Sequence, residues 1–568
     1  MRVFLLTSVV AAWLVTPALV AQRRPLTVVE ASIPEMQRAL LEKRVTSVAL
    51  VTESLTRIGL YDDQLHATLF VNRQALDDAA ALDRERAAGH VRGPLHGIPV
   101  AVKDNVQTVN MPTTGGALAF AGYTPPYEAT LVVNLRAAGA IVIAKTGMTE
   151  LANWVAGAPT PMPTNYNSLG GFGFNPYDPR RDPRASRFDG RPVLATGGSS
   201  AGGGTAVSFW AANVGTETSG SILSPSNQNM LVGIKPTVGR ISRYGVIPIT
   251  ADQDTPGPMA RSVTDAAVML GVLEGASPDP RDAATHACPR PAGHDYTPFL
   301  RADALRGARI GIPRAFYYDR AVIPGSPALR GGLSPALASM RAEVIDVLRQ
   351  QGAIVVDPAN IPSVIDPRPE ENIERWNPCS GADEGKGQDE DCSIVLKYGM
   401  KRDFNRWLAS LGTTPPVKTL SELRAWNIEH QSAGTLKYGQ SNLDISDEMD
   451  LTADRARYER DRARDLHLSA EHGIDEVMKA ERLDALLFPG GDGADLAARP
   501  GYPTVIVPFG FVPVDASAGA AFPAGFNPKP SPFGVSFTGA ACSEPRLVAL
   551  AYAFEQATKR RIQPSLFP

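Results

Sequence analysis

The sequence predicts an α/β fold in which a large mixed β-sheet is sandwiched between helices. From residue 95 onward, short runs rich in β-branched and apolar residues alternate with Ala-rich runs of helical character. The strand-like runs are apolar throughout, which is typical of strands covered by helices on both faces. A chain of 568 residues is long enough for several domains. Length is only a soft guide, however, and one large domain with a core over about residues 32–560 accounts for the pattern.

Two helices are expected at the beginning of this core. Ser32 and Glu35 have the spacing of a capping box, and Pro34 suits the first turn of a helix. Residues 47–58 carry apolar side chains at helical spacing. Both patterns predict helices.

The alternating region supplies the strands and further helices. The runs that predict strands are residues 98–102, 140–144, 309–312, 353–356, 485–488 and 504–507. The runs that predict helices are residues 130–138, 335–351 and 544–560, with a short apolar helix expected over residues 205–214. Irregular segments at residues 177–191, 366–399 and 512–532 are expected to be insertions. Because such loops commonly rim an active site, we expect substrate preference to depend on them.

The N-terminal segment has the character of an export signal. Arg2 precedes an apolar run that extends to about residue 15, and small residues lead to Ala21. The run is short for a bilayer span, so we expect residues 1–21 to be a cleaved signal peptide and residues 22–568 to be the mature chain. The protein is then periplasmic or secreted, with no membrane span after cleavage; an uncleaved N-terminal anchor is the alternative.

The composition argues against several classes of partner. With 56 basic and 59 acidic side chains, the formal net charge is -3, so the chain offers no extended basic field to a nucleic acid. The histidines and cysteines show no zinc-binding spacing. We therefore expect no metal, no organic cofactor and no nucleic-acid partner, and the sequence does not predict the oligomeric state.

The spacing of the cysteines predicts one disulfide. Cys379 and Cys392 lie close in sequence and bracket an acidic, Gly-rich stretch of a chain that we expect to be exported. We predict a bridge between them, with two free thiols in a surface loop as the alternative. Cys288 and Cys542 give no spacing signal.

Two Ser-bearing, Gly-rich segments indicate chemistry. Residues 196–204 read TGGSSAGGG, and residues 215–221 read GTETSGS. Glycines allow backbone NH groups to approach a ligand and allow positive φ angles, which an oxyanion site made of main-chain donors requires. Ordinary turns are the alternative. Neither segment has the residues of a Walker loop or of a dinucleotide-binding loop.

The base that would activate one of these serines is not an obvious histidine. Residues 198–202 match the GxSxG elbow, with Ser200 as nucleophile, but no later histidine has a recognisable catalytic setting. Lys103 is a candidate because it ends the apolar run of residues 98–102. Burial disfavours an ammonium and lowers the pKa of the amine, which can then accept a proton. A lone strand-end lysine is more often ion-paired, so its combination with the Ser-rich segments carries the assignment.

Together these segments resemble the amidase-signature family. The resemblance rests on Lys103 within HGIPVAVKDN, on the two Ser-bearing segments and on GIKPT at residues 233–237, in the order found in that family. It extends over about residues 32–560, and residues 253–262 (QDTPGPMARS) are most similar to secreted bacterial peptide amidases. The resemblance implies the amidase-signature fold and a serine amidase that hydrolyses linear carboxylic amide C–N bonds, with peptide C-terminal amides among the candidate substrates.

The resemblance also implies a role for each site residue. Ser221 is expected to be the nucleophile, Ser199 the bridging serine on a cis peptide bond, and Lys103 the base, working through an acyl-enzyme. Ser200 is expected to support the site by hydrogen bonding. The expected oxyanion-hole donors are the backbone NH groups of Thr218, Ser219, Gly220 and Ser221.

Three departures from the family pattern bear on the substrate and on the site. Leu223 stands where many relatives have an arginine, and it cannot pair with a substrate carboxylate. We therefore expect a small amide or a peptide amide that is uncharged near the scissile bond. Ser219 stands where many relatives have glycine, and residues 226–229 (SNQN) replace a small apolar run, which is expected to change the acyl pocket.

Two other functions are alternatives. The first is a tRNA-dependent amidotransferase A-type subunit; the export signal and the weak net charge count against it. The second is a catalytically silent secreted binding protein that keeps the fold. Reaction of the nucleophile with a fluorophosphonate distinguishes an enzyme from such a binding protein.

Overall fold

The computed structural model of the protein describes residues 26–158, 160–380, 390–514 and 520–568. The expected signal peptide, residues 1–21, lies outside these ranges. Inside them, none of the helices combines the length and the apolar character that a bilayer crossing requires.

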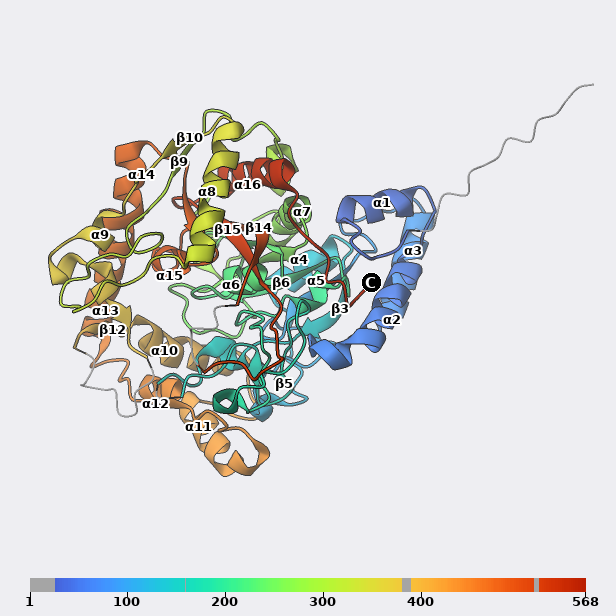
Figure 1. Ribbon diagram of the computed structural model, residues 1–568. Helices are drawn as coiled ribbons and strands as arrows, with labels where there is room; N and C mark the ends of the chain where they lie inside the picture. Colours follow the sequence, from blue (N-terminus) through green and yellow to red (C-terminus); the bar gives the residue numbers. More distant parts are fainter. Residues whose placement is uncertain (1–25, 159, 381–389, 515–519) are drawn as a thin grey trace, which may run out of the picture.

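An eleven-stranded mixed sheet runs through the protein (Figure 1), in the order β1-β3-β2-β6-β8-β7-β14-β15-β13-β9-β10. Strands β3, β2 and β6 are parallel, as are β13, β9 and β10, and antiparallel pairs join these two groups. This confirms the predicted mixed sheet. The strands are β1 (Thr68–Val71), β2 (Pro99–Lys103), β3 (Ile141–Thr146), β6 (Ala212–Glu217), β7 (Val232–Lys235), β8 (Thr255–Ala260), β9 (Arg309–Gly311), β10 (Ile354–Val356), β13 (Ala485–Pro489), β14 (Thr504–Val512) and β15 (Ser531–Thr538).

Helices cover both faces of the sheet. Val100 and Val102 of β2 belong to the largest apolar core, whereas Ala101 belongs to a separate core. Successive residues of a strand point to opposite faces, so the two cores lie on opposite sides. The helices in the first core include α4 (Thr130–Ala137), α7 (Val263–Glu274), α8 (Pro335–Gln350), α14 (Asp475–Glu481) and α16 (Glu544–Thr558). The helices in the second are α2 (Ser47–Leu65) and α3 (Ala75–Ala87).

The N-terminal helices lie beside the C-terminal end of the chain (Figure 1). Helix α1 (Ile33–Leu41) begins with the predicted capping box, in which Ser32 and Glu35 each accept a hydrogen bond from the backbone NH of the other. Arg57 of α2 donates to the carbonyls of Phe567 and Pro568, which ties the C-terminal segment to this helix.

A helical layer extends from one end of the sheet and has its own apolar core. Phe404 and Trp407 pack against Phe120 there, with ring centroids 6.4 and 5.7 Å from the Phe120 ring. Helices α10 (Val395–Ser410), α11 (Leu420–Glu429) and α12 (Ser441–Asp447) contribute to this core, and α13 (Arg455–Leu466) follows them along the chain. Helix α10 begins within the insertion predicted at residues 366–399. The short helices elsewhere are α5 (Gly203–Ala206), α6 (Leu223–Gln228), α9 (Pro362–Ile365) and α15 (Ala494–Ala498), and the two-residue strands are β4 (Tyr166–Asn167), β5 (Gly171–Phe172), β11 (Asn377–Pro378) and β12 (Cys392–Ser393).

Two disulfides join described segments. Cys379 and Cys392 are bridged as predicted. Cys288 and Cys542, for which the sequence gives no indication, form a second bridge across 254 positions of the chain. The fold brings these two cysteines together, and their sequence spacing could not have shown it.

The prediction of a helix over residues 205–214 is wrong. Helix α5 ends at Ala206, and β6 begins at Ala212. Val214 pairs with Val102 of β2 and with Pro258 of β8, so sheet pairing on both sides outweighs the local helical pattern. The correction matters because β6 leads directly into the second Ser-bearing segment.

Candidate active site

The two parallel strands β2 and β6 end side by side. Their register pairs Ala101 with Asn213 and Val102 with Val214, so Lys103 at the end of β2 lies beside the end of β6. The Lys103 Nζ donates to the carbonyl of Thr216 at 3.1 Å. In α/β sheets, functional groups gather at the carboxyl ends of adjacent strands. The sheet therefore delivers Lys103 to the turn that carries Ser221.

Lys103 is in direct contact with one of the predicted serines. Its Nζ lies 2.7 Å from the Ser199 Oγ, and both side chains are fully buried. The peptide bond between Gly198 and Ser199 is cis, as expected from the sequence. The Ser199 carbonyl accepts a hydrogen bond from the Thr149 NH at 3.0 Å, which fixes the segment at a second point.

Ser200 connects the two Ser-bearing segments. Its NH donates to the Ser221 carbonyl at 3.3 Å, and its hydroxyl donates to the Thr216 carbonyl and accepts from the Thr216 NH, both at 3.2 Å. These are the supporting contacts expected of Ser200. Ser221 is 7% exposed and lies against the segment that carries Ser199. The structure thus brings the Ser221 backbone against the segment that carries Ser199, the hydrogen-bond partner of Lys103.

The turn over residues 218–221 is anchored from both ends. The Glu217 carboxylate accepts from the NH groups of Ile222 at 2.7 Å and Leu223 at 3.0 Å. Gly220 has a φ of +83°, in the left-handed region that favours glycine. Among the described residues, the backbone NH groups of Thr218, Ser219, Gly220 and Ser221 donate to no protein acceptor. They are available to stabilise an oxyanion.

The side chains of this turn are held by two acids. The Thr218 hydroxyl donates to Asp254 at 2.5 Å, and the Ser219 hydroxyl donates to Asp495 at 3.0 Å. The sequence patterns did not identify Asp254 and Glu217 as parts of the site. Their positions could have identified them, because Glu217 directly precedes the predicted oxyanion donors and Asp254 lies within the QDTPGPMARS segment.

Burial sets the protonation of the site. It lowers the pKa of Lys103 to about 7, although Asp254 and Glu217 act in the opposite direction. Burial also raises the pKa of Asp254 to about 7. Near neutral pH, a substantial fraction of Lys103 is therefore a neutral amine beside Ser199.

Two neighbouring buried lysines make different contacts. Lys145 pairs with Asp104 at 3.4 Å. It also donates to the carbonyl of Pro112 and to the Thr113 hydroxyl. Lys235 donates to the carbonyl of Tyr502 at 2.5 Å. Of the three buried lysines in this region, Lys103 is thus the one whose amine is directed at Ser199.

The departures from the family pattern have clear structural positions. Leu223 is fully buried in a small apolar cluster with Ala494 and Ile506. In the run of residues 226–229, the Asn229 side chain donates to the carbonyls of Thr196 and of Pro225 in α6, and none of the four residues lines the cavity described next.

A cavity of 420 Å³ adjoins the end of β6. Thr216 and Thr218 contribute to its wall, together with Asn105, two residues after Lys103. The Asn105 side-chain amide donates to the Thr216 hydroxyl at 3.0 Å. The cavity therefore lies against the same strand end as Lys103.

Comparison with known proteins agrees with this geometry. The family described as Amidase matches residues 49–548. A probable amidase of Arabidopsis thaliana is 32% identical over 544 residues, covering 94% of this chain and 91% of that protein. The A subunit of a glutamyl-tRNA(Gln) amidotransferase of Chloroflexus aurantiacus is 38% identical over 329 residues, covering 57% of this chain and 60% of that protein.

A solved structure shows the same architecture along nearly the whole chain. The native peptide amidase from Stenotrophomonas maltophilia superimposes with a TM-score of 0.75 at 32% identity, covering 94% of this chain and 98% of that one. The sheet, the segments around Lys103, Ser199 and Ser221, and these similarities lead to one conclusion: the chain belongs to the amidase-signature family and is an amide-hydrolysing enzyme.

Proposed function

We propose that the chain is an exported serine amidase that hydrolyses uncharged linear amides, C-terminal amides of peptides among them, through an acyl-enzyme. Ser221 is the nucleophile, Ser199 relays the proton and Lys103 is the base. The observation that carries the proposal is the 2.7 Å contact between the Lys103 Nζ and the Ser199 Oγ in a fully buried site.

The proton path follows from the contacts of Lys103. As an ammonium it donates to both Ser199 and the Thr216 carbonyl. As a neutral amine it still donates to Thr216 and offers its lone pair to the Ser199 hydroxyl. Ser199 passes its proton to Lys103 and accepts the proton of Ser221, whose Oγ attacks the carbonyl carbon of the amide.

The remaining steps use the turn over residues 218–221. Its NH groups, which donate to no protein acceptor within the described part of the chain, stabilise the negative charge that develops on the carbonyl oxygen, and each effective donor contributes about 3–4 kcal/mol. The C–N bond then breaks as the proton returns through Ser199 to the leaving nitrogen. A water molecule cleaves the Ser221 ester by the same proton path in reverse and releases the carboxylic acid.

The position of Leu223 and the similarities to known amidases support uncharged linear amides as substrates. Leu223 occupies a buried apolar position, so it offers no charge to a substrate carboxylate. The similarity to a peptide amidase extends along 94% of the chain. The match to the amidotransferase subunit covers 60% of that protein, against 91% of the Arabidopsis amidase, which favours an amidase over a component of an amidotransferase. Export rests on the N-terminal segment of the sequence.

A fluorophosphonate probe tests the nucleophile. We expect the wild-type protein to be labelled, Ser221→Ala to remain unlabelled, and Ser224→Ala, three residues further along, to be labelled like wild type. Ammonia release from a panel of neutral peptide amides is expected to follow the same order. Ammonia release by Ser221→Ala at the wild-type rate would remove Ser221 from the mechanism. A folded wild-type protein that is neither labelled nor active would favour the binding-protein alternative.

A further inference from the structure

The cavity beside β6 has the position of a substrate subsite. Its wall contains Thr216, whose carbonyl accepts from Lys103, and Thr218, three residues before Ser221. The Thr218 side chain is held by Asp254, which also lines the cavity. A group bound here lies next to the strand end and the turn that carry the proposed chemistry.

The cavity wall is mostly apolar and aromatic. Tyr127 and Tyr244 contribute stacked rings with centroids 5.0 Å apart, and Trp407 of α10 adds a third aromatic side chain. Residues 246–249 (VIPI) form a further apolar part of the wall. Such a lining favours an apolar or aromatic group over a charged one.

The charges in the wall are compensated within the protein. Arg243 pairs with Asp282 at 2.5 Å, and Arg406 pairs with Asp403 at 3.3 Å. The third arginine of the wall, Arg281, pairs with Asp279 at 2.9 Å. Each arginine therefore already has a carboxylate partner, so the wall suits an uncharged ligand.

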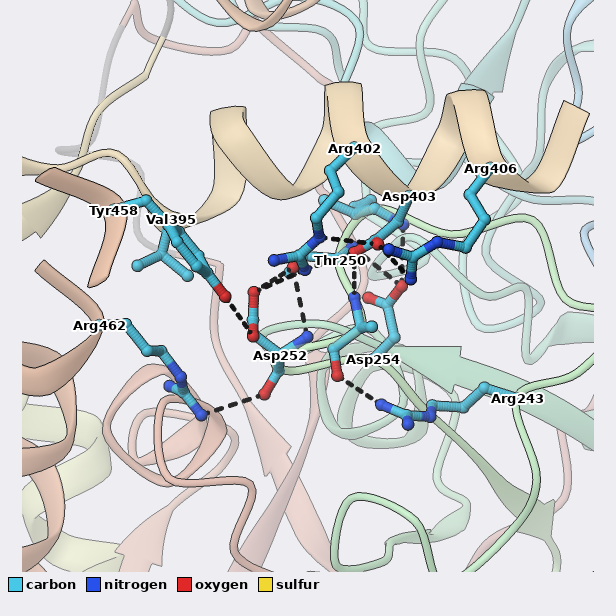
Figure 2. Close-up of polar contacts among 12 residues, drawn as sticks. Arg243, Thr250, Asp252, Asp254, Val395, Arg402, Asp403, Arg406, Tyr458 and Arg462 are labelled. Atoms are coloured by element: carbon cyan, nitrogen blue, oxygen red, sulfur yellow. Dashed lines mark hydrogen bonds and ion pairs between the residues drawn. The ribbon is translucent and has the colours of Figure 1, made fainter. Parts of the chain in front are cut away.

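The helix that forms one side of the cavity is fixed to the loop on the other side. Figure 2 shows Asp403 and Arg402 of α10 pointing toward the loop that carries Asp252 and Asp254. Asp403 accepts from the Ala251 NH at 2.7 Å, and Arg402 donates to Asp403 at 2.7 Å and to Asp252 at 3.0 Å. The cavity is thus preformed, which reduces the entropy lost when a ligand binds.

Resting on the proposed function, we propose that this cavity is the subsite for a bulky aromatic or branched apolar group on the acyl side of an uncharged primary amide. A primary amide loses only ammonia, so its bulk must belong to the acyl part. The volume of 420 Å³ lies within the range of about 300–1,000 Å³ that is common for small-molecule sites, and it accommodates an aromatic side chain with its neighbouring backbone.

A cavity-filling variant tests the subsite. Ala251 lines the cavity and is exposed, and only its backbone contacts Asp403 and Arg243, so Ala251→Trp adds volume without removing those contacts. Ala409→Trp is the matched control, because Ala409 is an exposed residue of α10 outside the cavity wall. The readout is the ratio of kcat/KM for N-acetylphenylalaninamide to kcat/KM for N-acetylglycinamide.

We expect wild type to favour the phenylalanine amide by about tenfold or more. Ala251→Trp is expected to lower this ratio by about tenfold, whereas Ala409→Trp keeps the wild-type ratio. Acetanilide carries its bulk on the amine side. A wild-type preference for acetanilide that Ala251→Trp removes would overturn the acyl-side assignment.

A binding measurement separates failure of the subsite from failure of the proposed function. In the Ser221→Ala background, calorimetry of N-acetylphenylalaninamide is expected to show about tenfold weaker binding when Ala251→Trp is added. Equal binding by the two proteins would overturn the subsite, whether or not wild type is an active amidase. If adding Ala251→Trp weakens binding but the wild-type protein shows no turnover, the subsite assignment stands and the proposed function is rejected.

Discussion

The Thr218 hydroxyl donates a 2.5 Å hydrogen bond to Asp254, a residue from a loop 36 positions further along the chain. The same carboxylate accepts from the NH groups of Ile249 at 2.8 Å and Thr250 at 3.0 Å. Asp254 therefore ties the turn with the proposed oxyanion donors to the loop before β8. It also opposes the lowering of the Lys103 pKa by burial, so one side chain acts on both the geometry and the electrostatics of the site.

Replacing Asp254 by Asn should change both the geometry and the electrostatics of the site. We expect kcat to fall by about tenfold or more, because Thr218 loses a charge-assisted hydrogen bond and the turn is held less firmly. The acid limb of the pH–rate profile should move to lower pH, because Asp254, with its own pKa of about 7, carries part of a negative charge there, and removal of that charge lowers the pKa of the Lys103 ammonium. Profiles of kcat and kcat/KM against pH measure both effects.

Asp252→Asn is the control for this variant. Asp252 lies on the same loop, but its side chain contacts Arg402 and Tyr458 rather than Thr218. The charged groups that act on Lys103 are Asp254 and Glu217, and Asp403 and Arg243 act on Asp254. An acid limb that stays in place or moves to higher pH in Asp254→Asn would contradict the electrostatic coupling.

Lys103→Met should separate activity from stability. Turnover should fall by about 10²–10⁴-fold, because the neutral base is lost from the side of Ser199. Wild-type activity should rise with pH through about 7, where the amine of Lys103 becomes neutral. Activity assays from pH 5 to 10 test both statements, and a Lys103→Met protein with wild-type turnover would exclude Lys103 as the base.

The same variant should be more stable than wild type at low pH. The folded-state pKa of Lys103 is lowered, so its burial destabilises the fold fully below about pH 7, and this penalty diminishes as the pH rises toward 10.5. The penalty is on the order of 5 kcal/mol. Thermal melting at pH 6 and pH 10 should show a larger gain in Tm for Lys103→Met at pH 6. An equal gain at both pH values would argue against a depressed pKa.

The two disulfides should contribute unequally to stability. The chain-entropy contribution grows with loop length and is about 5 kcal/mol for the Cys288–Cys542 bridge, against about 3 kcal/mol for Cys379–Cys392. Replacing the first pair by serines should lower Tm more than replacing the second. Mass spectrometry of unreduced peptides should recover both bridges, and free thiols at these positions in oxidised protein would refute them.

Much of the site could be predicted because its residues occupy short, continuous segments. Lys103 follows an apolar strand, and Ser199 and Ser221 lie on Gly-rich turns, so local pattern and resemblance were sufficient to name them. The residues that hold these segments in place could not be predicted in the same way. Asp254 and Glu217 act through hydrogen bonds to backbone and hydroxyl groups, which leave no spacing pattern in the sequence.

The sequence by itself determined the α/β class, six of the eleven strands of the main sheet, the capping box of α1 and the identity of the candidate catalytic side chains. Only the tertiary structure decided that residues 212–217 form a strand, that Cys288 meets Cys542, and that α10 closes a cavity beside Thr218. The physical reason is the distance along the chain over which each kind of interaction acts. Local propensities act over a few residues, whereas sheet pairing, burial and cavity shape depend on segments brought together from hundreds of positions apart.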